Sequence, residues 1–99
     1  MAELKDISGN NRIIITVLGH DRVGIIAGVT SVLSENHINI LDISQTILQE
    51  FLVMVLIADM EGSKMNLADL KESLHSKGKG LGVRIEAQHE DAFGYMHRI

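Results

Sequence analysis

The spacing of apolar residues changes along the first third of the chain from a strand pattern to a helix pattern. Residues 12–18 are mostly β-branched or otherwise apolar, which favours a strand. After Gly24, apolar residues recur every three or four positions up to residue 35, which favours an amphipathic helix. We therefore expect a strand over residues 12–18, a short polar loop that begins at Gly19, and a helix over residues 24–35.

Two further strands follow, and they differ in pattern. Within residues 38–48 the apolar positions change phase after Ile40, which predicts a strand with a bulge or bend there. Residues 49–50 are short enough to form a hairpin turn. Residues 51–59 are apolar in both phases, which is typical of a strand that is covered on both faces.

The last part of the chain predicts a second helix and a fourth strand. Residues 65–77 have leucines at helical spacing, with Ser63 or Asn66 as the cap and Gly78 as the terminating residue. Residues 81–89 alternate between apolar and polar side chains, which predicts a half-buried strand.

The predicted order is βαββαβ, which is typical of an α+β ferredoxin-like sandwich with two helices on one face of a four-stranded antiparallel sheet. We expect a loose N-terminal tail over residues 1–11, one domain over residues 12–89, and a C-terminal extension over residues 90–99 that forms a short helix. The second apolar face of the strand at residues 51–59 then needs a cover, either from a partner subunit or from the C-terminal segment. Homodimerisation is the most common solution.

Composition narrows the class of protein. The chain has 99 residues, a net charge of −4 and three aromatic residues, so a nucleic-acid partner is not expected. The longest apolar run, residues 51–58, is too short to span a membrane, and residues 1–11 lack the apolar core of a signal peptide. We expect a soluble cytoplasmic protein with no direct contact to nucleic acid or membrane.

Reactive groups are scarce. The chain has no Cys, which excludes disulfides, thiolate nucleophiles and Cys-ligated metals. The five His are not spaced as metal ligands on one helix face, so no metal site is expected. No nucleophile–base set or carboxylate pair is evident, and we expect neither an enzyme nor a cofactor.

The loop over residues 19–25 and Asn39 are the candidate binding elements. Loops at the carboxyl ends of strands often bind ligands in α/β folds. Asp21 could accept hydrogen bonds from a ligand ammonium, and Arg22 could pair with a carboxylate; the alternative is a solvated polar turn with a surface ion pair. The amide of Asn39 offers donors and acceptors together, which suits an α-amino acid. Its alternative role is to hold the turn into the second strand.

Residues 19–46, GHDRVGIIAGVTSVLSENHINILDISQT, resemble the first half of an ACT domain. The resemblance rests on the polar pair Asp21-Arg22 before Gly24, on the segment His37-Ile38-Asn39-Ile40, and on the βαββαβ order, and it covers about residues 12–89. The string at residues 42–46 is similar to stand-alone ACT proteins of bacteria and archaea. These proteins are similar in turn to the ACT repeats of the glycine cleavage system transcriptional repressor.

The resemblance implies a non-enzymatic regulatory module that acts as a homodimer and binds a small molecule, an amino acid above all. It implies that Asn39 faces the loop at residues 19–25, across a dimer interface, and that a regulated protein partner reads the result. The alternative is a protein-interaction or assembly module with a vestigial ligand site, suggested by the doubly apolar strand and by Phe93 and Met96. The ligand-binding residues expected from the resemblance are Gly19, His20, Asp21, Arg22, Val23, Gly24, Ile25, Asn39 and Ile40.

Overall fold

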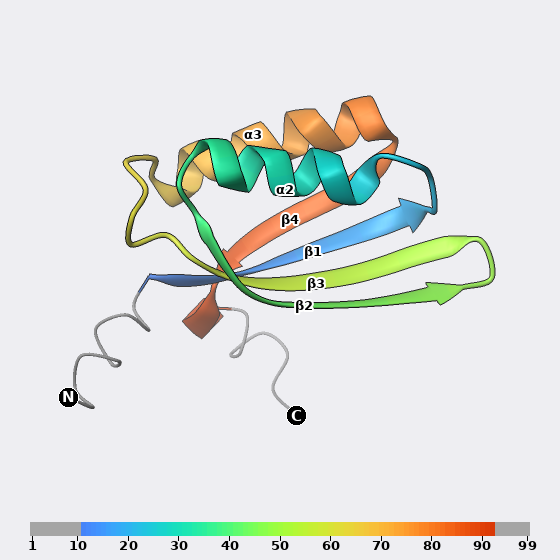
Figure 1. Ribbon diagram of the computed structural model, residues 1–99, viewed down its shortest axis with the longest axis horizontal. Helices are drawn as coiled ribbons and strands as arrows, with labels where there is room; N and C mark the ends of the chain where they lie inside the picture. The colour runs from blue at the N-terminus through green and yellow to red at the C-terminus, as the bar shows by residue number, and fades with distance from the viewer. Residues whose placement is uncertain (1–10, 93–99) are drawn as a thin grey trace.

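A computed structural model describes residues 11–92 of the chain. Its elements in chain order are β1 (Arg12–His20), α2 (Ile25–Glu35), β2 (Asn39–Leu48), β3 (Phe51–Asp59), α3 (Leu67–Leu81) and β4 (Val83–His89). The strands pair antiparallel in the order β2-β3-β1-β4, and both helices lie on one face of the sheet (Figure 1). This arrangement confirms the expected ferredoxin-like sandwich.

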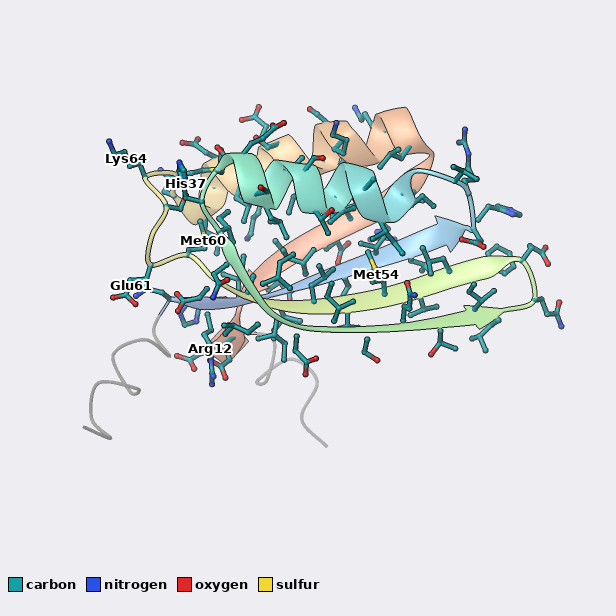
Figure 2. All side chains as sticks on the ribbon, in the orientation of Figure 1. Arg12, His37, Met54, Met60, Glu61 and Lys64 are labelled. Atoms are coloured by element: carbon teal, nitrogen blue, oxygen red, sulfur yellow. The ribbon has the colours of Figure 1, made fainter. Side chains whose placement is uncertain are left out.

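The core lies between the sheet and the two helices. Side chains of a strand alternate between faces, so every second residue of β1 and β3 points toward the helices. Figure 2 shows Met54 of β3 in this layer. The helices contribute residues four positions apart, which lie on one helix face. The buried residues of this layer include Ile13, Ile15, Val17, Val29, Leu33, Leu52, Met54, Leu56, Leu70 and Leu74.

Neither α2 nor α3 covers the other face of the sheet, which we call the open face. Its apolar strip comes from the two central strands, β1 and β3. The strip consists of Ile14 and Leu18 of β1 and of Phe51, Val53, Val55 and Ile57 of β3. Only the side chains of β3 that point toward the helices are therefore fully buried. The sequence predicted that the other face of this strand is covered as well, and the described part of the chain does not bury it fully.

β1 is longer than the sequence suggested. Gly19 and His20 pair with Leu52 and Phe51 of β3, so the prediction that the strand stops before Gly19 is wrong. Gly19 also pairs with Val83 of β4, and a Cβ on Gly19 would lie 2.7 Å from Val83 Cγ1. The glycine therefore permits a close contact between strands, where the sequence suggested a turn.

The end of α3 also differs from the prediction. The helix continues through Gly78 and ends at Gly82, whose φ of 75° is the left-handed conformation that glycine adopts without strain. A Cβ on Gly78 would lie 2.7 Å from the carbonyl oxygen of Val83, so this glycine allows the helix to approach β4. Because the helix includes Leu81, β4 begins at Val83, two residues later than predicted.

The remaining boundaries agree with the patterns on which they were based. Asn66 is the N-cap of α3, where its side chain accepts a hydrogen bond from Asp69 N at 2.8 Å. The register of β2 against β3 shifts between Ile40 and Asp42, which confirms the bulge near Ile40. Residues 90–92 are helical, as expected for the start of a C-terminal helix; residues 93–99 and 1–10 lie outside the described residues.

Candidate functional site

The loop between β1 and α2 is attached to the β2–β3 hairpin. Asp21 N donates a hydrogen bond to the carbonyl oxygen of Glu50 at 2.8 Å. The rings of His20 and Phe51 are 4.7 Å apart between centroids and tilted by 46°. The loop and the hairpin turn therefore form one end of the molecule.

Arg22 links the same loop to the end of α3. Its Nη1 donates to the carbonyl oxygen of Leu81 at 3.0 Å. The last carbonyls of a helix lack partners within the helix and carry a partial negative charge, so a guanidinium there is favourable. A Cβ on Gly82 would lie 2.7 Å from this nitrogen, which gives Gly82 a second structural role. One donor of Arg22 is thus engaged with the protein itself.

The start of α2 presents backbone groups without a side-chain cap. Gly24 has a φ of 96°, a conformation that favours glycine, and no atom lies within 4 Å of the place where a Cβ would stand. The first turn of α2 contains no acidic residue, and Val23 beside it is exposed. Helix N-termini of this kind attract anions such as a carboxylate. Gly24 therefore both shapes the loop and leaves its backbone accessible.

Asn39 lies at the opposite end of the sheet from this loop. Asn39 pairs with Asp59, which pairs with Arg12 at the first residue of β1. His20, the last residue of β1, pairs with Phe51. Eight residues of strand separate the two ends, which is about 26 Å. A single chain therefore brings the residues of the β1–α2 loop together, and it leaves Asn39 and Ile40 at the far end.

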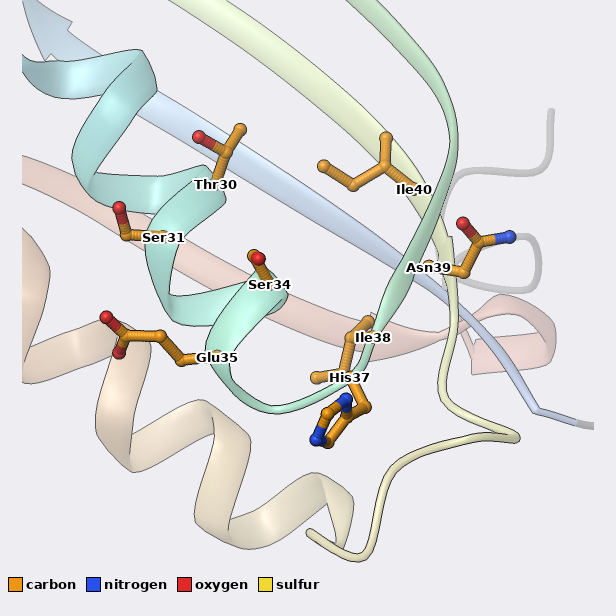
Figure 3. A pocket seen from close by; sticks show the side chains of 8 residues that line it. All are labelled: Thr30, Ser31, Ser34, Glu35, His37, Ile38, Asn39 and Ile40. Carbon is orange, nitrogen blue, oxygen red and sulfur yellow. The ribbon is translucent and has the colours of Figure 1, made fainter.

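Asn39 and His20 nevertheless project from the same face. Their partners on β3 are in the phase of that strand that points away from the helices, and cross-strand partners share a face. Figure 3 shows the side chain of Asn39 pointing away from α2 and that of Ile40 pointing toward it. His20 and Asn39 both belong to the open face, at opposite ends.

An open groove of about 790 Å³ runs between the end of α2 and the start of β2 (Figure 3). Its lining residues are Thr30, Ser31, Ser34, Glu35, His37, Ile38, Asn39 and Ile40. Sequence reasoning identified the last two and missed the polar residues of α2. Their signal was present: the polar positions of α2 recur at helical spacing opposite its buried stripe. The hydroxyl of Thr30 donates to the carbonyl of Ile26 at 2.8 Å, so its donor is used within the helix.

β2 differs from the other strands in exposure. It lies at the edge of the sheet, so one side of its backbone has no strand partner within residues 11–92. All residues from position 41 to position 48 are exposed. The large apolar side chains among them are Leu41, Ile43, Ile47 and Leu48. An exposed edge strand with this composition is a surface suited to pairing with another strand.

Residues 11–92 hold no cluster of three or more His, Asp or Glu side chains that could bind a metal ion. None of the helices described between those positions is long and apolar enough to cross a membrane.

A family model of the ACT domain matches residues 11–88. The chain belongs to the ACT domain family. It is 48% identical over 89 residues to a UPF0237 protein of Methanocaldococcus jannaschii, an alignment that covers 90% of this chain and 99% of the relative. The ACT domain thus spans β1 to β4 and includes every candidate ligand-binding residue.

Two solved structures show the same fold. An ACT domain protein from Streptococcus pneumoniae superposes with a TM-score of 0.73 at 33% identity, covering 89% of this chain and 96% of that one. A protein provisionally identified as a glycine cleavage system transcriptional repressor superposes with a TM-score of 0.68 at 21% identity, covering 78% of this chain and 44% of that one. The expected family and fold are confirmed. ACT domains are commonly regulatory ligand-binding modules.

Proposed function

We propose that this ACT domain protein is a non-enzymatic, cytoplasmic regulatory module that forms a homodimer through β2 and binds a small molecule, an amino acid above all. The observation that supports the dimer is the exposed apolar edge of β2. Adding a strand to this edge would satisfy its unpaired backbone groups and bury its large apolar side chains. A second copy of the chain offers the same edge, and isologous pairing is the usual way in which homodimers form.

Pairing through β2 would create a composite site. In an antiparallel pair that keeps the two open faces on one side, the regular part of β2 is centred on Gln45, so Asp42 of one chain lies opposite Leu48 of the other. Asn39 then lies just beyond Leu48 of the other chain, beside its hairpin turn. Leu48 belongs to the hairpin end, to which Asp21 is attached by its bond to Glu50. The 26 Å separation within one chain therefore becomes a short separation between two chains.

The residues at this junction offer the chemistry that an α-amino acid needs. The carboxylate of Asp21 accepts from an ammonium group, and the amide of Asn39 from the other chain both donates and accepts. The backbone N–H groups at the start of α2 suit a carboxylate. Arg22 contributes by holding the loop against α3 through Leu81.

The regulatory mechanism follows from a site shared by two chains. A ligand that contacts both chains binds the paired arrangement better than the separated chains, so it shifts the population toward that arrangement. The output then depends on a protein partner that distinguishes the two states. The similarity to an apparent transcriptional repressor concerns the fold alone.

Calorimetric titration with each of the twenty amino acids tests the ligand. We expect at least one to bind wild type, and we expect Asn39→Ala to weaken that binding roughly 10- to 100-fold, because a hydrogen bond to a charged group contributes about 1.5–3 kcal/mol. Glu72→Ala, on the exposed side of α3, is the control and should bind like wild type. Absence of heat with all twenty at millimolar concentration, or unchanged binding by Asn39→Ala, contradicts the ligand proposal.

A second candidate function is an assembly module whose ligand site is vestigial. The exposed Leu18 and Phe51 on the open face favour it, because exposed apolar patches often mark protein contacts. It predicts that the chain dimerises and binds a protein partner with the same affinity in the presence and absence of every amino acid.

A further inference from the structure

The open face is covered at one end and exposed at the other. Ile14 and Leu18 are large aliphatic residues in the same phase of β1, and both point away from the helices. Ile14 is 7% exposed, whereas Leu18 is 50% exposed. Ile14 lies near the start of β1, beside the end of β4. Whatever shields the open face therefore approaches from the end where β4 finishes.

The chain after β4 turns onto that end of the open face. Arg12 is in the same phase of β1 as Ile14, and Figure 2 shows its side chain on the side of the sheet away from the helices. Its Nε and Nη2 donate to the two carboxylate oxygens of Glu90 at 2.9 and 2.7 Å. This bidentate pair fixes the direction in which the chain leaves β4. Residues 90–92 form a helical turn on that side of the sheet (Figure 1).

We propose that residues 93–99 of this chain dock on the open face of their own sheet and extend over Thr16, Val53 and Val55 toward Leu18. The segment has the sequence FGYMHRI, in which Phe93, Tyr95, Met96 and Ile99 supply apolar surface. If the helical turn at residues 90–92 continues, Phe93 and Met96 lie on one side of it.

The length of the segment matches the distance it has to cover. Ile14 and Leu18 are four residues apart on β1, which is about 13 Å. Seven residues span about 10 Å as a helix and about 23 Å when extended. The segment therefore reaches the exposed end of the open face when it is extended, and as a helix it covers most of that distance.

Two features of the open face suit such an occupant. A hollow of about 320 Å³, lined by Thr16, Leu18, Val53 and Val55 and by the ion-paired Arg84 and Glu86, lies along the path. The buried Gln88 Oε1 beside Ile14 has no hydrogen-bond partner within the described part of the chain. A buried acceptor without a partner is costly, and a backbone N–H or the Tyr95 hydroxyl of the docked segment would satisfy it.

A second copy of the chain is a poorer occupant than the segment. Four strands of up to ten residues offer a face on the order of 600 Å², from the spacing of strands and residues. Standard interfaces bury about 800 Å² per partner. The face is therefore small for a stable dimer, and it is well matched to a short segment that is already tethered beside it.

A spin label on residue 97 tests the docking directly. The chain contains no Cys, so His97→Cys provides a single attachment site for a nitroxide in the full chain. We expect the backbone resonances of Thr16, Val53 and Val55 to lose most of their intensity and those of α2 to keep it. The matched control is Ser76→Cys on α3, which should instead broaden resonances of the helices. Unbroadened open-face resonances with the label at residue 97 overturn the proposal.

Two further samples separate the alternatives. The first sample mixes isotope-labelled chains that carry no nitroxide with unlabelled chains that carry the nitroxide. The broadening of the open-face resonances should disappear in this mixture. Broadening that persists in the mixture places the segment on a second copy and also overturns the proposal. The double variant Phe93→Ser, Met96→Ser should abolish the broadening and shift the Val53 and Val55 methyl signals to their positions in a chain that ends at Ala92. Broadening that survives both substitutions contradicts an apolar docking.

Discussion

The two edge strands of the sheet, β2 and β4, differ in almost every respect. β4 has seven residues, carries the exposed ion pair between Arg84 and Glu86, and is packed against α3, where Gly78 allows close contact. β2 has ten residues, and its residues from position 41 to position 48 are all exposed, four of them large and apolar. In the described part of the chain, both strands leave one side of the backbone without a strand partner.

This difference shows how one sheet can block association at one edge and favour it at the other. A short edge with charged side chains disfavours the addition of a strand, and a long apolar edge promotes it. The same comparison bears on the candidate site. Asn39 begins the exposed edge strand, so the proposed pairing of that edge would bring it toward another chain's β1–α2 loop.

The largest expected effect comes from charging the β2 edge. Ile43→Lys with Ile47→Lys places two lysines on the strand in each copy, and we expect the dimer to weaken by about 3 kcal/mol or more, roughly 100-fold in Kd. Sedimentation velocity across a dilution series measures this. Glu86→Lys on β4 is the control and should dimerise like wild type. Equal weakening by both variants would contradict the proposed difference between the edges.

Substitutions at two glycines of α3 test how closely this helix packs against β4. Gly78→Ala puts a Cβ 2.7 Å from the carbonyl oxygen of Val83, and we expect it to reduce the free energy of unfolding by about 1–3 kcal/mol. Gly80→Ala meets no atom within 4 Å and should raise that free energy by about 0.5–1 kcal/mol. Urea denaturation of both variants measures the pair. Similar changes in the free energy of unfolding, with the same sign for both variants, would show that α3 does not pack closely against β4 at Gly78.

The smallest expected effect concerns the end of β4, where Arg12 holds Glu90. The two hydrogen bonds and the charge of Arg12 keep the pKa of Glu90 below its usual value. A carboxyl group whose pKa is lower in the folded state stabilises the fold above its unfolded pKa, and this contribution is lost as pH falls through the folded value. Wild type should therefore lose slightly more stability on acidification than Glu90→Gln. Identical pH profiles of the unfolding free energy would show that the pair contributes nothing.

Much of the fold followed from the spacing of apolar residues. The change of phase after Ile40 predicted the bulge, because a strand has a side-chain period of two and cannot change phase without one. The end of α3 could not be predicted in this way. Gly78, Gly80 and Gly82 are equally suited to end a helix in the sequence, and the packing against β4 determines that the helix ends at Gly82.

The candidate site was predictable in its residues and not in its arrangement. The resemblance to ACT domains indicated the β1–α2 loop and Asn39, yet it did not show that one chain separates them. That separation follows from topology: α2 runs back along the sheet, so β2 begins at the end where β1 started. The engagement of Arg22 by Leu81 depends on where α3 ends, which the sequence did not reveal.

Oxidative cross-linking of single cysteines tests the central claim, that β2 is the edge that pairs two copies. The chain has no Cys of its own, so Gln45→Cys at the middle of β2 and Glu86→Cys on β4 each introduce one thiol. A residue on the two-fold axis of an antiparallel pair lies opposite its own copy, within disulfide range. We predict a covalent dimer with Gln45→Cys and monomer with Glu86→Cys. Monomer with both variants, or equal cross-linking of both, would contradict the account.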